Sequence, residues 1–226
     1  MVHHWGGEQL GKIIISDLDN KVKQAMKWGH KAIAITDHGN MFGAIEMYKE
    51  CKKQGIKPII GCEVYVAPRS RLDKEGRLDT EPNHLILLAM NNNGYKNLSR
   101  LVSLGYTEGF YYKPRIDYEL LEKYHEGIIA LSACLGGEVQ SFELRDNYEK
   151  AKETALFYKD VFKDGFYLEI QNHGLEEQQL VNSYLRLYSK KYGVKTVATN
   201  DVHYINKDDA ETQDVLMCVQ TGRNVD

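Results

Sequence analysis

Acidic and histidine side chains follow two apolar segments of this sequence where each segment ends. Asp37 and His38 follow residues 31–36, and Asp201 and His203 follow residues 195–200. In an extended chain, residues i and i+2 point to the same side, so Asp201 and His203 can reach a common ligand. Imidazole and carboxylate groups are typical ligands of divalent metal ions. The pattern therefore predicts a metal site.

Further candidate ligands lie in or after other apolar segments. Cys134 follows residues 127–133, His173 follows residues 166–172, and Glu63 lies inside the apolar run 57–67. A carboxylate buried in such a run is costly unless it is paired or bound to a metal.

Each candidate also has an ordinary explanation. A single histidine at a strand end is commonly hydrogen-bonded or exposed. Asp37 or Asp201 alone could cap a helix or close a turn, and Cys134 alone could be a small buried apolar residue. Together they favour a metal site.

The elements that would position these residues alternate along the chain. Strand-like runs occupy residues 31–36, 57–67, 84–90, 127–133, 166–172 and 195–200. Amphipathic helices are predicted over 41–55, 148–165 and 175–193, each ending in basic residues and a glycine (Gly55, Gly165 and Gly193). In the first of them, the apolar positions are Phe42, Ile45, Met47 or Tyr48, and Cys51. Near-continuous apolar strands favour a parallel sheet covered by helices, which leaves a barrel or an open sheet.

Three regions depart from this alternation. Residues 68–83 are polar and predict a surface loop or hairpin arm, and residues 211–226 predict a helix. Ser16 and Asp17 are expected to cap a helix that begins at Leu18, with a short strand ahead of them.

Composition limits the classes of function. The 226 residues suit one α/β domain, and the net charge of -3 does not indicate a general polyanion binder, so any nucleic-acid contact must be local. Four cysteines without regular spacing (Cys51, Cys62, Cys134 and Cys218) and the lack of a signal-peptide pattern indicate a reduced, cytoplasmic chain. No apolar run is long enough to span a membrane, so no membrane attachment is expected. The tyrosines beside Lys113 and Arg115 could stack on bases while the two cations hold phosphate, or they could be ordinary half-buried loop residues.

Long stretches of the chain resemble a known family. "AIAITDHGNMFGAIEMYK", "GIKPIIGCEVYVAP", "GYKNLSRLVSLGYTEGFYYKPRID", "EGIIALSACLGGE", "QNHG" and "VATNDVHY" closely resemble the polymerase and histidinol phosphatase (PHP) domain of bacterial DNA polymerase III alpha subunits. The resemblance implies an α/β fold, a distorted (β/α)7 TIM-like barrel. It implies a PHP domain over residues 17–226, ending where the family's polymerase region would begin, and a divergent or rebuilt N-terminal segment over residues 1–16.

The resemblance also implies a metal-ligand set: His3, His38, Glu63, His84, Cys134, Asp201 and His203, with Asp37 and His173 lining the site. His84 opens its predicted strand, so the resemblance alone supports it. The implied ions are Zn, Mn or Fe, up to three of them, or fewer because Met1 and Leu10 stand where the family has ligands.

The implied activity is metal-dependent phosphoester hydrolysis at DNA 3′ ends, of the 3′–5′ proofreading exonuclease type. Metal ions would activate a bound water as nucleophile, and Lys113 and Arg115 would contact phosphate. The implied partners are DNA, the rest of the polymerase chain and a proofreading exonuclease subunit. Two alternatives stay open. One is a catalytically degenerate scaffold that stabilises the polymerase and docks the proofreading subunit, and the other is a free-standing PHP phosphatase. The family's polymerase aspartates lie beyond this chain, so it is not expected to polymerise DNA.

Overall fold

The computed structural model describes residues 2–5 and 15–225, and of residues 2–5, 15–17, 220 and 221 it describes the backbone alone. The strands of this part form a single sheet with an irregular connection pattern. They are β1 (Val2–Trp5), β2 (Ala32–Ile35), β3 (Lys57–Val66), β4 (Asn83–Ala89), β5 (Arg115–Ile116), β6 (Ile128–Leu131), β7 (Phe166–Ile170) and β8 (Lys195–Val202).

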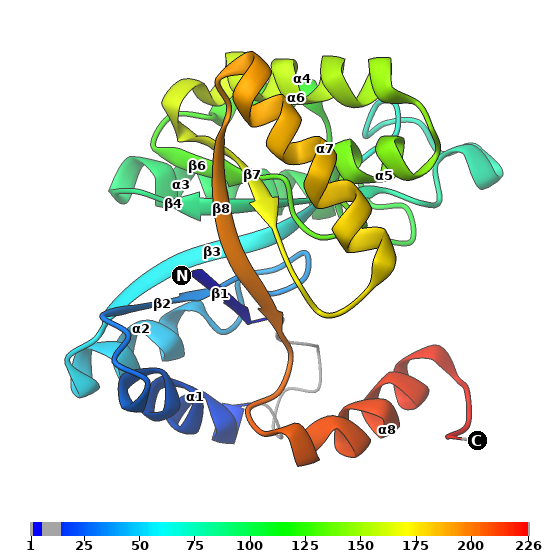
Figure 1. The fold of residues 1–226 in the computed structure, drawn as a ribbon. Coiled ribbons are helices and arrows are strands. Elements are labelled where there is room, and N and C mark those ends of the chain that lie inside the picture. Colours follow the sequence, from blue (N-terminus) through cyan, green and yellow to red (C-terminus); the bar gives the residue numbers. More distant parts are fainter. Residues whose placement is uncertain (1, 6–14, 226) are drawn as a thin grey trace.

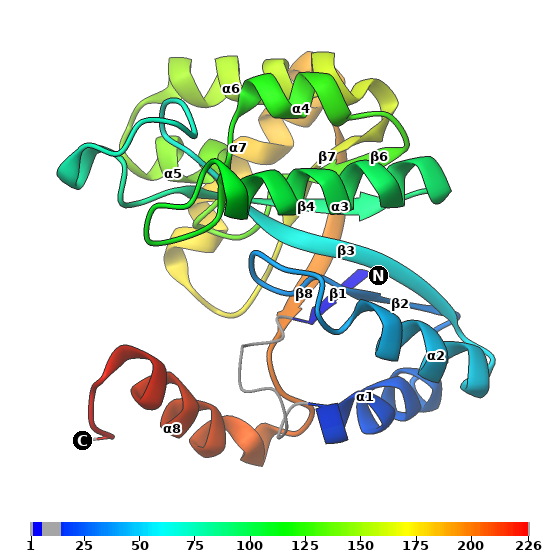
Figure 2. The ribbon, with the colours of Figure 1, turned by 180° about the vertical axis from the view of Figure 1, so that it is seen from behind.

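The sheet curls into a barrel-like shape (Figures 1 and 2). Its strand order is β1-β8-β7-β6-β4-β3-β2, with β5 paired to β3 outside this path. The two ends of the path, β1 and β2, lie close to each other. A curled sheet of this kind, flanked by helices, confirms the predicted distorted TIM-like barrel.

Strand β4 runs opposite to its neighbours, which differs from the predicted parallel sheet. It pairs antiparallel with both β3 and β6, whereas β2–β3, β6–β7, β7–β8 and β1–β8 are parallel. The β3–β4 connection contains only the short 3-10 helix η1 (Gly76–Leu78) and no crossover helix. A connection without a crossover helix suits an antiparallel pair, because a parallel pair needs a long crossover. The first residues of β4 therefore lie at the end of the barrel where β3 finishes.

The predicted helical regions are helical, and the structure adds others. The helices are α1 (Ile15–Lys27), α2 (Ala44–Gln54), α3 (Asn92–Thr107), α4 (Tyr118–Tyr124), α5 (Glu138–Leu144), α6 (Tyr148–Phe162), α7 (Glu176–Tyr192) and α8 (Ala210–Thr221), with short 3-10 helices η2 (Lys163–Gly165) and η3 (Lys207–Asp209). None of the helices in the described ranges is long and apolar enough to cross a membrane.

Some helix boundaries differ from those predicted. Helix α1 begins at Ile15, so Ser16 and Asp17 lie in its first turn and do not precede it. Gly55 and Gly193 end α2 and α7 with φ of 80° and 64°, as expected for glycine after a helix. Helix α6 instead ends at Phe162 and not at the predicted Gly165, and Lys163 follows it with a positive φ of 52° and a ψ of -124°.

Helix α2 buries two of its predicted apolar positions, Met47 and Cys51, but not Phe42 and Ile45. Ala44, Met47 and Cys51 are buried, whereas Phe42 and Ile45 are 72% and 56% exposed. The helix begins only at Ala44, so Phe42 precedes it, and the i, i+3, i+7 set of Ala44, Met47 and Cys51 defines the inner face.

Two apolar layers pack against the sheet. One lies between the sheet and the helices, and the other consists of Ile86, Leu88, Leu131 and Ala133 with partly buried neighbours. Glu63 pairs with Ile86 of the second layer, so the carboxylate of Glu63 lies beside a packed apolar surface.

Candidate metal centre

Two predicted histidine ligands, His38 and His84, meet at the carboxylate of a third predicted ligand, Glu63. Oε1 of Glu63 lies 2.7 Å from Nδ1 of His38 and 3.0 Å from Nδ1 of His84. His38 reaches this point because the turn after β2 pairs with β3: Gly39 N donates to Glu63 O, and Glu63 N donates to Asp37 O. His84 reaches it because β4 is antiparallel, which places His84 opposite Tyr65, two residues beyond Glu63.

Three further predicted ligands extend this group on both sides. Cys134 Sγ lies 3.6 Å from Nδ1 of His84. The ring of His203 stacks on that of His38 with centroids 5.8 Å apart, and its Nδ1 is 3.9 Å from Oδ1 of Asp201. We call the following six residues the ligand cluster: His38, Glu63, His84, Cys134, Asp201 and His203.

Charge is distributed unevenly within the ligand cluster. Burial raises the pKa of Glu63, but its hydrogen bonds with His38 and His84 outweigh this and hold the pKa well below its usual range. Burial lowers the pKa of His84, and contacts with Cys134 and Glu63 reverse the effect and raise it to about 10. Burial also lowers the pKa of His38, but the hydrogen bond and charge of Glu63 outweigh this effect and raise the pKa above its usual value. The buried carboxylate of Glu63 therefore lies between two imidazole rings whose pKa values it raises.

The donor types in the cluster fit transition-metal ions. Imidazole, carboxylate and thiolate together favour Zn, Mn or Fe over Mg. Among the residues that the structure describes, however, no group of three or more His, Cys, Asp or Glu side chains surrounds a single point as one ion would require. An imidazole binds a metal only when it is neutral. Because Nδ1 of both His38 and His84 faces Glu63, Nε2 is the ring nitrogen that each would use toward an ion, with the Glu63 contacts kept.

Asp37 acts through the backbone of the next helix. It is buried, and its Oδ2 accepts a hydrogen bond from Gly43 N, the residue that precedes α2, at 3.1 Å. This contact links the end of β2 to the start of α2 and fixes the turn that carries His38. The N-cap residue of α2 is Gly43, so Asp37 hydrogen-bonds to the start of the helix without being its cap residue.

His173 is exposed at the start of the segment that leads to α7. Its backbone N donates to Oε1 of Gln178 at 2.8 Å, and its Nδ1 lies 2.9 Å from Nε2 of the same residue. These hydrogen bonds of His173 are thus with α7 and not with the ligand cluster.

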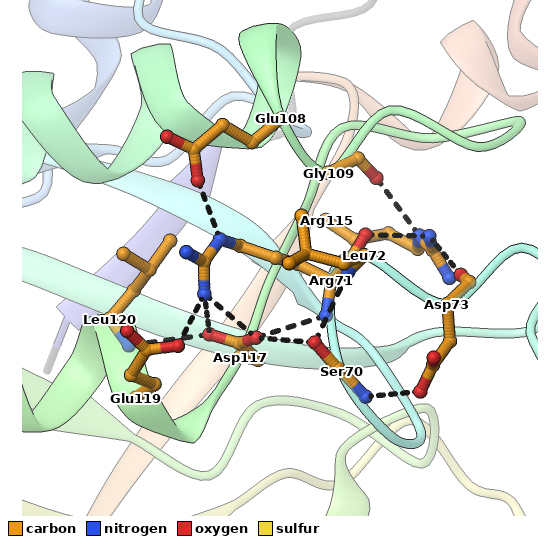
Figure 3. Close-up of polar contacts among 10 residues, drawn as sticks. All are labelled: Ser70, Arg71, Leu72, Asp73, Glu108, Gly109, Arg115, Asp117, Glu119 and Leu120. Atoms are coloured by element: carbon orange, nitrogen blue, oxygen red, sulfur yellow. Dashed lines mark hydrogen bonds and ion pairs between the residues drawn. The ribbon is translucent and has the colours of Figure 1, made fainter.

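The prediction that Arg115 contacts phosphate is wrong. Arg115 is fully buried, and its guanidinium donates to four backbone carbonyls, those of Arg71, Asp73 and Gly109 (Figure 3) and that of Asp79. With its donors occupied inside the protein, this arginine holds the 68–83 loop against the segment before β5. Sequence reasoning misplaced it because a charge beside exposed tyrosines resembles a phosphate contact.

Lys113, in contrast, is exposed beside the ligand cluster. Its Nζ lies 5.3 Å from the ring centroid of Tyr65, and this ring meets the ring of His84 edge-on at 5.4 Å. The predicted ligand His3 lies in β1, with its backbone opposite Asn200, but its side chain is outside the described residues, as are Met1 and Leu10.

Two further residues shape the site, Tyr65, which sequence reasoning missed, and Gly39, the glycine that lets the chain turn after His38. Tyr65 is on the same face of β3 as Glu63, which the i, i+2 spacing could have indicated. Gly39 has φ of +67°, and a Cβ there would lie 2.9 Å from both Pro114 Cγ and Tyr65 Cε2, so the turn next to His38 needs glycine.

Comparisons with known proteins agree with this architecture. The family model of the PHP domain matches residues 15–173. DNA polymerase III subunit alpha of Borreliella burgdorferi is 51% identical over 94% of this chain, and that of Thermus aquaticus is 48% identical over 91%. The chain spans 18% of the length of each of these two relatives.

Two solved structures share the fold at low sequence identity. A candidate metal-dependent phosphoesterase from Bifidobacterium adolescentis aligns over 100% of this chain and 96% of its own, with a TM-score of 0.53 and 12% identity. An amidohydrolase from Chromobacterium violaceum with bound sulfate and no metal covers 92% of this chain and 88% of its own, with a TM-score of 0.50 and 13% identity. The family match and the fold together show that this chain belongs to the PHP domain family, and its curated relatives are alpha subunits of DNA polymerase III.

Proposed function

We propose that this chain is the metal-dependent phosphoesterase domain of a DNA polymerase III alpha subunit and hydrolyses DNA from the 3′ end as a 3′–5′ exonuclease. The observation that carries the proposal is the convergence of His38, Glu63 and His84 at one end of the barrel. Only the reversed direction of β4 makes this convergence possible. A buried carboxylate with several imidazole and thiol groups around it is costly to maintain without a function.

The ligand cluster, with His3, would hold divalent Zn, Mn or Fe ions. When bound, such ions lower the pKa of a coordinated water and polarise a phosphoryl oxygen. The protein's own residues do the positioning: Asp37 fixes the His38 turn, and Tyr65 packs against His84. Lys113 lies where its charge would attract a phosphodiester toward the cluster.

The proposal extends to the surroundings of the domain. We take residues 17–226 as the PHP domain and the DNA 3′ end as its substrate. The rest of a polymerase chain and a proofreading exonuclease subunit would be its partners in the bacterial cytoplasm. The polymerase relatives support this context, and their identity of about half makes a free-standing small-molecule phosphatase the weaker reading.

A degenerate scaffold is the second candidate, and one observation favours it. His38 and His84 are bonded to Glu63 and not arranged around a common point, and Met1 and Leu10 stand at family ligand positions. Such a domain would stabilise the polymerase and dock a proofreading subunit without binding metal stoichiometrically.

Metal content and hydrolysis together distinguish the two candidates. Tag-free protein and an Asp201→Ala/His203→Ala double variant would be compared by plasma mass spectrometry after incubation with zinc or manganese. The same proteins would then be assayed on a 3′-labelled single-stranded oligonucleotide. The phosphoesterase predicts bound metal and 3′ hydrolysis in the wild type only.

His125→Ala is the matched control, because His125 lies outside the cluster and contacts the backbone of Glu122. Equal hydrolysis by wild type and double variant would refute the phosphoesterase. Absence of metal from both proteins after reconstitution would favour the scaffold.

A further inference from the structure

Aromatic side chains gather on an exposed loop beside the ligand cluster. In the segment 106–113, which begins with the last two residues of α3 and which we call the aromatic loop, Tyr106, Phe110 and Tyr112 are 37%, 49% and 70% exposed. The rings of Tyr106 and Phe110 stack with centroids 6.2 Å apart, and Tyr111 meets Tyr112 edge-on at 4.8 Å. Large aromatic rings in water, grouped in this way, indicate a binding surface.

Contacts with two arginines, Arg115 and Arg71, fix the conformation of the aromatic loop. Nε of the buried Arg115 donates to Gly109 O at 3.0 Å, and the Arg115 guanidinium lies 5.3 Å from the ring centroid of Tyr111. Nε of Arg71 donates to Glu108 at 2.8 Å (Figure 3). A tight turn, in which Tyr111 N donates to Lys113 O, gives Tyr112 its φ of 58°. Because the loop is already ordered in the folded protein, a ligand that binds here loses little binding free energy to the ordering of the loop.

The C-terminal end of the aromatic loop lies next to the ligand cluster. Pro114, which follows it, approaches the His38 turn so closely that a Cβ on Gly39 would lie 2.9 Å from Pro114 Cγ. Lys113 is over the ring of Tyr65, which in turn contacts His84. A chain bound along the loop would therefore continue toward His38 and His84.

We propose that the aromatic loop is a base-stacking platform for single-stranded nucleic acid. Phe110 and Tyr112 stack on successive bases, and Lys113 pairs with the phosphate that leads into the ligand cluster. Aromatic rings interleaved with a cation fit a strand, in which every base has a flat face and every linkage is anionic. An aliphatic patch would fit a protein partner better. The inference deepens the proposed function and rests on it, since it takes the strand as the substrate of that site.

The test measures binding and not hydrolysis. A fluorescent oligothymidine and an abasic oligonucleotide of equal length and charge are titrated with the full chain in the presence of a chelator, and anisotropy is recorded. The wild type is expected to bind the strand that carries bases more tightly. Phe110→Ala and Tyr112→Ala are each expected to weaken binding about 5- to 100-fold, the effect of losing one stacked base. They should leave abasic binding nearly unchanged.

Matched variants separate stacking from other effects. Tyr112→Phe keeps the ring and is expected to bind like the wild type. Tyr48→Ala removes a tyrosine that is 49% exposed on α2, as Phe110 is on the loop, and is expected to have no effect. Circular dichroism checks that each variant is folded.

Several results would overturn the proposal. One is equal affinity of the wild type for the two strands, which needs no variant. A second is unchanged oligonucleotide affinity in both alanine variants. A third is that the alanine substitutions alter only the self-association of the protein, measured by sedimentation, which would make the loop a protein interface. If base-dependent binding persists but no metal-dependent hydrolysis is found, the proposed function fails and the platform stands.

Discussion

The buried arginine in the 68–83 loop network provides the most quantitative prediction. Replacing Arg115 by Met removes four hydrogen bonds to backbone carbonyls, with lengths of 2.8 to 3.0 Å, from a side chain that is fully buried. Each buried acceptor left without a donor costs at least about 1 kcal/mol, so the free energy of unfolding should fall by about 4 kcal/mol. This is a large part of the 5–15 kcal/mol that is typical of a folded protein, roughly speaking.

Urea unfolding followed by far-UV circular dichroism measures this loss. With an m value of about 3 kcal/mol per molar urea, the midpoint should fall by roughly 1 M or more. Lys113→Met, two residues away on the exposed loop, should shift the free energy by less than about 0.5 kcal/mol. Arg115→Lys keeps the charge but not the planar fork of donors and should be intermediate. A wild-type midpoint for Arg115→Met, with weakened oligonucleotide binding, would show that the arginine contacts phosphate and would refute the structural role.

Three other changes test different parts of the molecule. Burial raises the pKa of Glu138 above its ordinary value of 4.5, so the folded state binds this proton more tightly than the unfolded state; the associated stability is present below about pH 4.5 and is lost as pH rises through the folded pKa. As pH rises from 4 toward neutrality, the free energy of unfolding of the wild type, measured in urea, should therefore fall relative to that of Glu138→Gln. A difference that does not vary with pH would contradict this. A Cβ on Gly94 would lie 1.8 Å from Gly127 O, so Gly94→Ala should cost about 1–3 kcal/mol by overpacking, and an unchanged melting temperature would exclude this close approach. Zinc or manganese at about 100 times its dissociation constant should stabilise the wild type by about 2.7 kcal/mol in a thermal shift assay, and His84→Ala should lose most of that gain, whereas an equal shift in both would place the metal elsewhere.

Much of the candidate site could be predicted from local sequence. The segments 31–36 and 195–200 are apolar and end in polar residues, and the corresponding strands β2 and β8 do deliver His38 and His203 to the same end of the barrel. These two strands could be predicted because strand propensity and the alternation of apolar and polar residues are properties of neighbouring residues. Glu63 could be singled out for the same reason, since an isolated carboxylate in an apolar run needs a partner.

Residues whose role depends on distant contacts could not be read in this way. Met47 and Cys51 are buried as predicted, but Phe42 and Ile45 are exposed because α2 begins at Ala44 and turns a narrower face inward. Arg115 resembled a phosphate contact, but its guanidinium is enclosed by a loop more than thirty residues earlier in the chain, at Arg71 to Asp79. Helix periodicity and charge indicate which side chains could be buried or could bind a ligand. The packing of distant segments decides which of them are buried.

The sequence by itself determined the strand and helix segments, the polar residues at the strand ends and, through extended resemblance, the PHP family. Only the tertiary structure decided that β4 runs antiparallel and so brings His84, at the start of its strand, to the carboxylate of Glu63 near the end of β3. Strand direction depends on how a whole connection folds back over the barrel, and no local pattern of residues encodes it.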